Sequence, residues 1–389
     1  MQERAEWDVA VIGGGPAGLS AAHAAAAAGA RTVILERAEH PRYKTCGGGL
    51  IGASLNAVRD LPAVPARDEI YAATFTLYGE HEFTRRGSRP LLTMVMREEF
   101  DAALLQRALA AGAEARQKTV ARGLTDDGPG HATIRLADGS SVTASVVIGA
   151  DGSGGISARY VGVAFSQVDL GLELEIAIPE ALQPGWRGRL LLDWGVMPAS
   201  YGWVFPKGDR LTVGVIAARN GADGRQGDAT RQYLREFTER LGLASCETLR
   251  DSGHLTRCRT DDSPLRKGRV IVAGDAAGLL EPWTREGISF ALRSGALAGE
   301  AAAKACAAGS PDQALDGYAR AIDQGLGAEM RASRVLLTAF TRHTRTFHKG
   351  LSTAQGWRLF ERICRSELPY PQLIRKPAAK VALSVLNRL

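Results

Sequence analysis

The N-terminal stretch alternates apolar runs with a glycine turn in a pattern that predicts a strand, a helix and a second strand. Asp8–Ile12 is a short apolar run of the kind that forms a buried strand. Gly13–Gly18 supplies a tight turn, and the Ala-rich segment Leu19–Ala28 predicts a helix that ends at Gly29. Arg31–Leu35 predicts the second strand, so the stretch forms one βαβ unit.

Beyond this unit, strand patterns and helix patterns occupy separate segments. Alternating apolar and polar positions predict sheet within 70–95 and 170–220, and helical spacing predicts helices at 97–111 and 228–243. Two further apolar strands end in carboxylates, one at Asp151 and one at Asp275. From Gly287 onward helix formers dominate.

These segments predict an α/β fold in which the chain returns to its first sheet. The expected fold class is a Rossmann-type dinucleotide-binding domain with an inserted antiparallel β-sheet domain for the substrate and a helical C-terminal region. We expect residues 1–60, 96–165 and 260–305 in the first domain, 61–95 and 166–259 in the second, and 306–389 in the helical region.

Composition narrows the class of protein further. The 389-residue chain carries 48 Lys and Arg against 42 Asp and Glu, a formal charge of +6. Residues 342–389 alone hold ten Lys and Arg and two Asp and Glu, so the basic excess belongs to the tail, which argues against a nucleic-acid partner. Neither a membrane-spanning apolar run nor a secretory signal appears, which predicts a cytoplasmic protein. The five scattered cysteines lack the spacing of a disulfide framework or a metal site, and we expect no metal.

The glycine turn has the spacing of a dinucleotide site, Gly13-x-Gly15-x-x-Gly18. Gly13 permits the tight turn, Gly15 lets a pyrophosphate approach the backbone, and Gly18 lets helix and strand pack closely. The phosphates would then meet the amides and the positive dipole at the start of the helix. Glu36 follows the second strand, where it would accept hydrogen bonds from the adenosine ribose and repel a 2′-phosphate.

Asp151 and Asp275 favour FAD over NAD as the ligand of this turn. An extended ribityl chain needs acceptors for its hydroxyl groups, and NAD has no ribityl chain. Each of the two carboxylates ends a strand and is followed by small residues. Taken alone, an Asp-Gly pair after a strand is usually a turn. Two such strand ends in a chain that begins with a Rossmann unit point to FAD.

The chain resembles the FAD-dependent geranylgeranyl reductase family, within the para-hydroxybenzoate hydroxylase-like class of flavoproteins. The resemblance runs from about Asp8 to Gly299 and rests on five blocks. The blocks are Gly13–Gly18, Pro41–Gly49, Gly149–Gly152, Tyr201–Pro206 and Gly274–Ile288. The Cys-Gly-Gly-Gly loop of the second block and the Tyr-x-Trp-x-Phe-Pro strand of the fourth point to the reductase branch.

The resemblance implies a set of residues around the cofactor. Arg97, at the start of its helix, would contact the flavin cofactor, Asp275 would bind the ribityl chain or pyrophosphate, and Gly287 and Ile288 would approach the pyrimidine side of the ring. The expected cofactor-binding set is Gly13, Gly15, Ala17, Gly18, Glu36, Arg37, Cys46, Gly47, Gly48, Arg97, Asp151, Gly152, Gly274, Asp275, Gly287 and Ile288. Because no second Gly-x-Gly-x-x-Gly motif appears, NAD(P)H would reduce the flavin transiently or an external carrier would do so.

Cys46, Tyr201 and Trp203 are the candidates for the chemistry itself. Reduction of an alkene by a flavin needs a hydride and a proton, and Cys46, Tyr201 or an ordered water could deliver the proton. Arg42 and Lys44 would favour the thiolate of Cys46, which could make it a proton donor or a redox-sensitive gate; the alternative is a buried apolar cysteine.

Aromatic residues are the candidates for binding the substrate. Tyr201, Trp203 and Phe205 alternate along a strand and therefore face one side, either as the wall of a hydrophobic pocket or as an ordinary core face. The family usually reads Pro-x-Thr-Gly-Glu-Gly-Ile, whereas this chain has Trp283 and a bulky Arg285 in that segment. Trp283 joins Trp203 and Phe205 in the expected substrate set, and Arg285 points either to the pocket or to solvent.

The implied function is reduction of C=C double bonds in a polyprenyl, geranylgeranyl-type group on a lipid, a quinone or a natural product. An FAD-dependent aromatic monooxygenase or halogenase on the same fold is the alternative, since halogenases carry a Trp-x-Trp-x-Ile-Pro strand similar to Tyr201–Pro206. Halogenases also need a lysine near a tunnel from the flavin, which the sequence does not identify. A third possibility is a flavin-containing protein that binds at a membrane surface without turnover.

The basic tail allows two structural readings. Its cations, which include Arg358 and Arg362, are interleaved with apolar residues such as Trp357 and Phe360. Such helices either lie on an anionic membrane or cap the sheet with a solvated basic face. The resemblance implies a hydrophobic prenylated small molecule as the partner, and the first reading of the tail would add peripheral contact with the inner face of a membrane.

Overall fold

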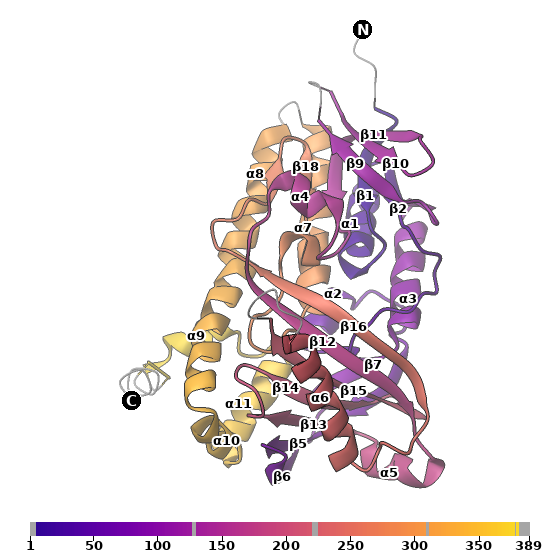
Figure 1. Ribbon diagram of the computed structural model, residues 1–389. Helices are drawn as coiled ribbons and strands as arrows, with labels where there is room; N and C mark the ends of the chain where they lie inside the picture. The colour runs from indigo at the N-terminus through magenta and orange to yellow at the C-terminus, as the bar shows by residue number, and fades with distance from the viewer. Residues whose placement is uncertain (1–4, 127–129, 220–224, 309–310, 378, 381–389) are drawn as a thin grey trace.

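The first sheet of the computed structural model gathers strands from distant parts of the chain (Figure 1). In spatial order its strands are β17 (Arg266–Lys267), β18 (Val270–Val272), β11 (Ser141–Gly149), β1 (Trp7–Ile12), β2 (Thr32–Leu35) and β8 (Glu114–Arg116), with β9 (Ala121–Thr125) and β10 (Ala132–Leu136) continuing from β11. β1 runs parallel to β2 and β11, and β11 runs parallel to β18, as a Rossmann-type sheet requires. The structure describes residues 5–126, 130–219, 225–308, 311–377 and 379–380.

Two Ala- and Gly-rich helices next to this sheet pack directly on each other. They are α1 (Pro16–Ala27) and α7 (Ile288–Ala307), and α3 (Arg97–Ala110) packs against α1 as well. A Cβ atom at Gly295 would overlap the carbonyl oxygen of Ala17, and one at Gly299 would overlap that of Ala21. The backbones approach this closely only because no side chain intervenes, and the contact brings the start of α7 next to the glycine turn before α1.

The second sheet has seven strands and lies below the first in Figure 1. In spatial order they are β16 (Thr248–Arg259), β12 (Phe165–Ala177), β15 (Arg210–Ala218), β14 (Tyr201–Pro206), β13 (Arg189–Trp194), β5 (Ala72–Leu77) and β6 (Glu80–Arg86). Neighbours are antiparallel except for β13 and β5, which run parallel. A third, small sheet orders β3 (Gly49–Leu50), β7 (Leu92–Val95) and β4 (Ala66–Ile70).

One face of the seven-stranded sheet is covered by α6 (Arg225–Arg240). Leu191, Val204 and Val213 on that face pack in one apolar cluster with Tyr233 and Phe237 of the helix. The opposite face, which carries the alternate residues of the same strands, is therefore available to line a site.

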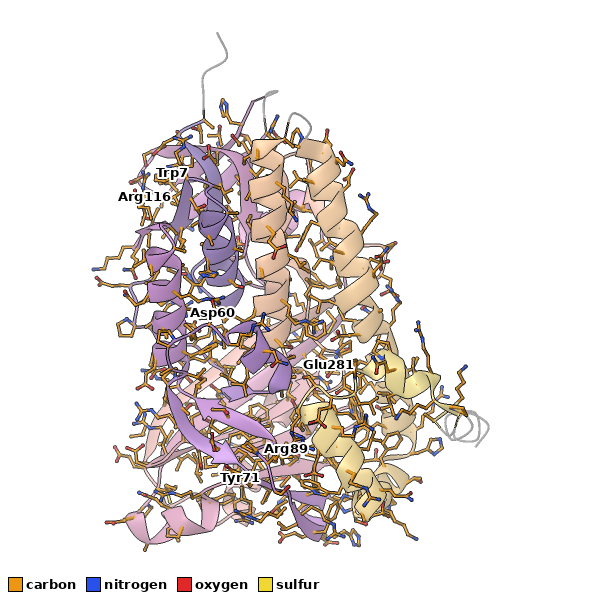
Figure 2. All side chains as sticks on the ribbon, turned by 180° about the vertical axis from the view of Figure 1, so that it is seen from behind. Trp7, Asp60, Tyr71, Arg89, Arg116 and Glu281 are labelled. Atoms are coloured by element: carbon orange, nitrogen blue, oxygen red, sulfur yellow. The ribbon has the colours of Figure 1, made fainter. Side chains whose placement is uncertain are left out.

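The C-terminal region is helical and lies beside both sheets. Its helices are α8 (Pro311–Ile322), the π-helical turn η3 (Asp323–Gly327), α9 (Ala328–Arg342), α10 (Thr344–Leu351), α11 (Ala354–Cys364) and α12 (Tyr370–Arg375). Shorter elements are α2 (Gly52–Ala57), α4 (Ile156–Val161), α5 (Gln183–Trp186) and the 3₁₀ turns η1 (Glu180–Leu182) and η2 (Gly274–Ala277). Figure 2, seen from behind, places Glu281 where the long upper helices meet the C-terminal ones. Among the residues that the structure covers, no helix has the length and apolar character needed to cross a membrane.

The expected fold class is confirmed, with a Rossmann-type sheet, an antiparallel sheet and C-terminal helices. The exact domain boundaries stay a prediction; residues 61–95 supply β4 and β7 to the small sheet and β5 and β6 to the large one. The sequence did not single out β16 as a strand. Residues 381–389 of the predicted basic tail lie outside the described residues.

Gly299→Val should lower the free energy of unfolding by about 1–3 kcal/mol, because overpacking a close contact has that cost. Urea denaturation followed by circular dichroism measures it. Gly317→Val in α8 is the matched control, since a Cβ there would meet only Arg320 Nη2 at 3.9 Å; its effect should stay within about 0.5 kcal/mol. Equal losses in both variants would contradict a role for the helix contact.

Candidate active site

The glycine turn forms one end of a large cavity. Gly13 adopts a φ of +107°, and α1 begins directly after it with Gly15 as its N-cap and Pro16 in its first turn. A Cβ at Gly18 would overlap the carbonyl oxygen of Gly13, so Gly18 serves helix packing. A Cβ at Gly15 would meet only Arg42 Nη2, at 3.8 Å, and would otherwise project into open space. The turn therefore presents backbone amides to the cavity without side chains in front of them.

Charged side chains cluster next to this turn. Glu36, at the end of β2, accepts hydrogen bonds from the amides of Gly14 and Ala38. Arg42 donates to the carbonyl oxygen of Gly14 at 2.9 Å and lies 3.3 Å from Asp101, which also receives two hydrogen bonds from Arg97. Arg42 and Arg97 both line the cavity, so a pair of fixed cations faces it beside the turn.

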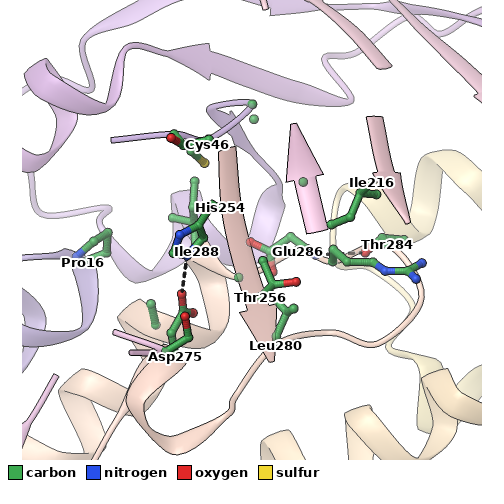
Figure 3. A pocket seen from close by; sticks show the side chains of 18 of the residues that line it. Pro16, Cys46, Ile216, His254, Thr256, Asp275, Leu280, Thr284, Glu286 and Ile288 are labelled. Atoms are coloured by element: carbon green, nitrogen blue, oxygen red, sulfur yellow. Dashed lines mark hydrogen bonds and ion pairs between the residues drawn. The ribbon is translucent and has the colours of Figure 1, made fainter. Parts of the chain in front are cut away.

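The two acidic strand ends reach the same cavity. Asp151 follows β11 and accepts a hydrogen bond from the amide of Ser157 at the start of α4, and burial raises the pKa of its carboxyl group. Asp275 follows β18 and lies 3.8 Å from His254 of β16 (Figure 3). Burial alone would raise the pKa of Asp275, but the neighbouring His254 and Lys44 outweigh it and lower that pKa.

The loop that carries Cys46 rests on the open face of the large sheet. One carboxylate oxygen of Glu173 accepts hydrogen bonds from the Cys46 amide at 2.7 Å and from the Tyr43 hydroxyl at 3.0 Å. A Cβ at Gly47 would lie 2.7 Å from the ring of Phe205, so glycine lets the loop pack on the aromatic strand. The sulfur of Cys46 accepts a hydrogen bond from the Gly48 amide at 3.4 Å. Cys46 is half-buried and lies above His254 in Figure 3.

Strand register shows how the open face is organised. Trp203 is paired with Leu192 of β13 and with Gly214 of β15, and Gly214 is paired with Glu173 of β12. Paired residues point to the same face of a sheet. A Cβ at Gly214 would overlap the indole of Trp203, so the glycine makes room for that ring. Across the strands the face thus changes from acidic and polar at β16 and β12 to aromatic and aliphatic at β14 and β13.

The apolar half of the cavity continues between the sheet and the C-terminal helices. The cavity has a volume of about 1700 Å³. Its apolar lining includes Leu190, Leu192, Trp194, Tyr201, Trp203, Phe205, Ile216, Trp283, Leu336, Phe340, Phe347, Leu351, Leu359, Phe360 and Ile363. One continuous space therefore joins the glycine turn to an aromatic-lined chamber.

The cavity brings together most of the residues that the sequence singled out. Lining it are Gly13, Gly15, Ala17, Glu36, Arg37, Cys46, Gly47, Gly48, Arg97, Asp151, Gly152, Tyr201, Trp203, Phe205, Asp275, Trp283, Gly287 and Ile288. Gly18 and Gly274 lie outside the lining; the amide of Gly274 donates to Ser294 instead. Sequence reasoning missed Glu173 and His254, whose strands carry no motif. Within the described part of the chain, no group of His, Cys, Asp and Glu side chains could hold a metal ion.

Comparison with known proteins agrees with this geometry. The sequence matches the FAD binding domain family over residues 6–324, so fold and site define an FAD-dependent flavoprotein and oxidoreductase. It is 32% identical over 338 residues to the digeranylgeranylglycerophospholipid reductase of Methanocaldococcus jannaschii, covering 77% of each chain. It is 31% identical over 319 residues to the geranylgeranyl diphosphate reductase of Rhodobacter capsulatus, covering 79% of this chain and 77% of that one. The chain belongs to the FAD-dependent geranylgeranyl reductase family, as the motifs predicted.

Solved structures share the fold. A geranylgeranyl bacteriochlorophyll reductase-like protein from Thermoplasma acidophilum superimposes with a TM-score of 0.75 at 23% identity, covering 98% of this chain and 99% of that one. A flavin-dependent brominase variant reaches the same TM-score of 0.75 at 19% identity, covering 99% and 100%. At these identities the likeness establishes the architecture, which reductases and halogenases have in common.

The residues present fit a bound FAD. Trp203 Nε1 is buried, lines the cavity and has no hydrogen-bond partner among the described residues, so a polar ligand would satisfy it, whereas His254 Nε2 faces Asp275 at 3.8 Å, which is longer than a hydrogen bond. The bare amides at the start of α1, together with Arg42 and Arg97, could hold a pyrophosphate, and Asp275 could accept from a ribityl hydroxyl. This arrangement suits a flavin dinucleotide better than a flavin mononucleotide, because it extends over both acidic strand ends, Asp151 and Asp275.

Gly15→Val should weaken FAD binding by about 10- to 100-fold. The valine side chain would take the space of the pyrophosphate, and overpacking of this kind costs about 1–3 kcal/mol. The fold should survive, since the new side chain meets no protein atom closer than Arg42. Flavin content after reconstitution, measured by absorbance and by fluorescence titration, tests this. Gly185→Val, at an exposed glycine away from the cavity, is the control and should stay fully loaded. A yellow Gly15→Val protein with unchanged affinity contradicts the assignment.

Proposed function

We propose that this protein is a flavin-dependent reductase that saturates carbon–carbon double bonds of a polyprenyl chain, and that the chain lies in the apolar half of the cavity. The single observation that carries the proposal is the continuity of one cavity from the glycine turn to the aromatic chamber. Relatives named as geranylgeranyl reductases support the same reaction class.

The protein's contribution to binding is hydrophobic. Each CH₂ group moved from water into an apolar site contributes about 0.8 kcal/mol, so a long isoprenoid gains most of its affinity from the chain. Trp203 and Phe205 form the wall next to the Cys46 loop, and Trp283, which packs on Phe340, continues it into the C-terminal helices. The same side chains exclude water from the reacting double bond.

Saturation of an alkene also needs a proton, for which we assign Cys46. FAD, when bound and reduced, supplies the hydride. The Tyr201 hydroxyl donates its hydrogen to the carbonyl oxygen of Thr284, and burial raises the pKa of Tyr201, so this group is poorly suited to give up a proton. The sulfur of Cys46 accepts hydrogen bonds from the Gly48 amide and from Arg97, and neither bond uses its S–H hydrogen. NAD(P)H or an external carrier protein would supply the electrons.

Anaerobic turnover tests the reaction directly. FAD-loaded protein reduced with dithionite is incubated with geranylgeraniol and geranylgeranyl diphosphate, and products are analysed by mass spectrometry. We expect mass increases in steps of two hydrogens. Cys46→Ala should lower the rate at least about tenfold, the lower part of the range for loss of a general acid, while flavin content stays unchanged. Absence of any reduced product with both substrates contradicts the proposal.

One observation favours the halogenase alternative strongly enough to test it. Lys44 lines the cavity, and burial lowers the pKa of its ammonium group. A lysine beside the flavin site was the feature that the sequence did not identify. Aerobic incubation with bromide, a reducing system and a phenol distinguishes the two functions: a brominated product that disappears in Lys44→Met would replace the reductase by a halogenase.

We also propose that the C-terminal helices contact an anionic membrane. The cavity lining reaches exposed residues of α10 and α11, among them Thr346 and Gln355. Lys349, Arg358 and Arg362 are exposed on the same two helices and make no ion pair within the described residues. A mouth lined by apolar side chains and rimmed by cations suits a substrate held in a lipid surface.

Arg358→Glu together with Arg362→Glu should weaken sedimentation with vesicles containing phosphatidylserine by at least about tenfold, since each cation near such a surface contributes about 1 kcal/mol. Arg135→Glu with Arg320→Glu makes the same change of net charge on β10 and α8 and should leave binding nearly unchanged. Equal effects of the two pairs would show that only the overall charge matters and would contradict a specific membrane face.

A further inference from the structure

Arg285 occupies a backbone conformation that glycine normally supplies. Its φ is +58°, in the left-handed region that larger residues rarely adopt. It stands in the segment 281–287, here called the cavity loop, at the position where the family pattern has glycine. Unusual backbone of this kind persists only where the surroundings enforce it, and such positions cluster at functional sites. The side chain of Arg285 shows what enforces it here.

The guanidinium of Arg285 is buried and fully engaged with three segments. Its side chain is 3% exposed and pairs with Asp169 of β12, which is 0% exposed, at 3.1 Å. Nη2 also donates to the carbonyl oxygen of Ala199, just before β14, at 2.7 Å, and Nη1 donates to that of Trp283 at 2.7 Å. One side chain therefore ties the cavity loop to β12 and to the segment just before β14.

Further hydrogen bonds brace the cavity loop internally and against β14. Glu281 accepts hydrogen bonds from the amide of Trp283, at 3.0 Å, and from the amide and hydroxyl of Thr284. The Tyr201 hydroxyl donates to the carbonyl oxygen of Thr284. Because these bonds brace the loop internally and tie Thr284 to β14, the loop backbone holds the Arg285 side chain in one position.

Strand register places this contact at one end of the aromatic chamber. Arg285 and Ile216 line the cavity, whereas Asp169 lies behind the lining. Ile216 is paired with Tyr201, the first residue of β14, and with Gly171 of β12. This row of paired residues lies where β14 begins. Asp169 is paired with Ala218 and lies two residues beyond Gly171 on the same face of β12, so the Arg285–Asp169 pair stands just past this row.

We propose that the Arg285–Asp169 pair is an end wall that limits the length of isoprenoid chain the cavity accepts. The inference rests on the proposed binding of a polyprenyl chain in the apolar half. A glycine at position 285 would leave the space in front of Asp169 open. In this protein the guanidinium of Arg285 fills that space and is held by four hydrogen bonds. Because the Arg285–Asp169 pair is polar, contact with it adds nothing to the binding free energy of an apolar chain end.

The test measures binding rather than turnover. FAD-loaded wild type, Arg285→Gly/Asp169→Asn and Arg285→Met/Asp169→Asn are titrated with linear prenols from geraniol to geranylfarnesol, in competition with a fluorescent apolar probe. The asparagine removes the unpaired charge and can still accept from Gln167. In wild type, affinity should rise with chain length and then level off.

In Arg285→Gly/Asp169→Asn, affinity should keep rising to a prenol at least one isoprene unit longer than in wild type. The longest prenol should bind at least tenfold more tightly than it binds to wild type. Arg285→Met/Asp169→Asn keeps the bulk and should level off where wild type does. Identical length profiles in all three proteins, or the same shift in both variants, overturn the end wall. Failure of wild type to bind any prenol rejects the proposed function itself, which separates the two outcomes.

A second variant keeps the test independent of folding in the first. Ile216→Phe adds bulk in front of the wall, from the neighbouring strand, and leaves the Arg285–Asp169 pair in place. Affinity should then level off at a shorter prenol than in wild type. An unchanged profile in Ile216→Phe, with flavin content preserved, contradicts the location of the wall.

Discussion

Every strand sends alternate side chains to opposite faces of its sheet, and in the seven-stranded sheet this alternation separates a structural face from a working face. Val204 and Val213 pack under α6, while Trp203 and the Cα of Gly214, one residue away on each strand, face the cavity. A shift of one residue in register would exchange the two sets. The aromatic chamber and the packing of α6 therefore depend on the same pairing between β14 and β15.

Across the working face the side chains also change from charged to apolar, and the charged ones are paired with nearby groups. Glu173 and Glu175 lie under the Cys46 loop, where burial raises the pKa of Glu173 and Lys207 pairs with Glu175 at 3.3 Å. Buried carboxylates of this kind need partners: the Cys46 amide and the Tyr43 hydroxyl donate to Glu173, and Lys207 and Thr212 donate to one oxygen of Glu175. The arrangement fixes the loop on the boundary between the charged and the apolar half of this face.

Motif-bearing residues were predictable because local chemistry alone explains them. The glycine turn, Glu36 and the strand-end carboxylates Asp151 and Asp275 needed only their spacing, and the alternation from Tyr201 to Phe205 gave the correct common face. β16 was missed because it is an edge strand made largely of charged and small polar residues, so it lacks the apolar alternation on which strand prediction rests. His254 was missed with it. The reach of the cavity into the C-terminal helices was also beyond the sequence, since an apolar helix face looks the same whether it packs on a sheet or lines a chamber.

The order of strands in the first sheet has a consequence for how the protein is made. β1 is paired with β11, and β11 with β18, so the sheet lacks its last parallel strand until the chain has been synthesised to about Val272. The whole intervening segment, with the seven-stranded sheet, leaves the ribosome first. Long-range pairings of this kind form slowly and leave strand edges exposed meanwhile. The glycine turn therefore belongs to a sheet that is completed only after β18 has been synthesised, and FAD that binds from then on would stabilise the folded state by mass action.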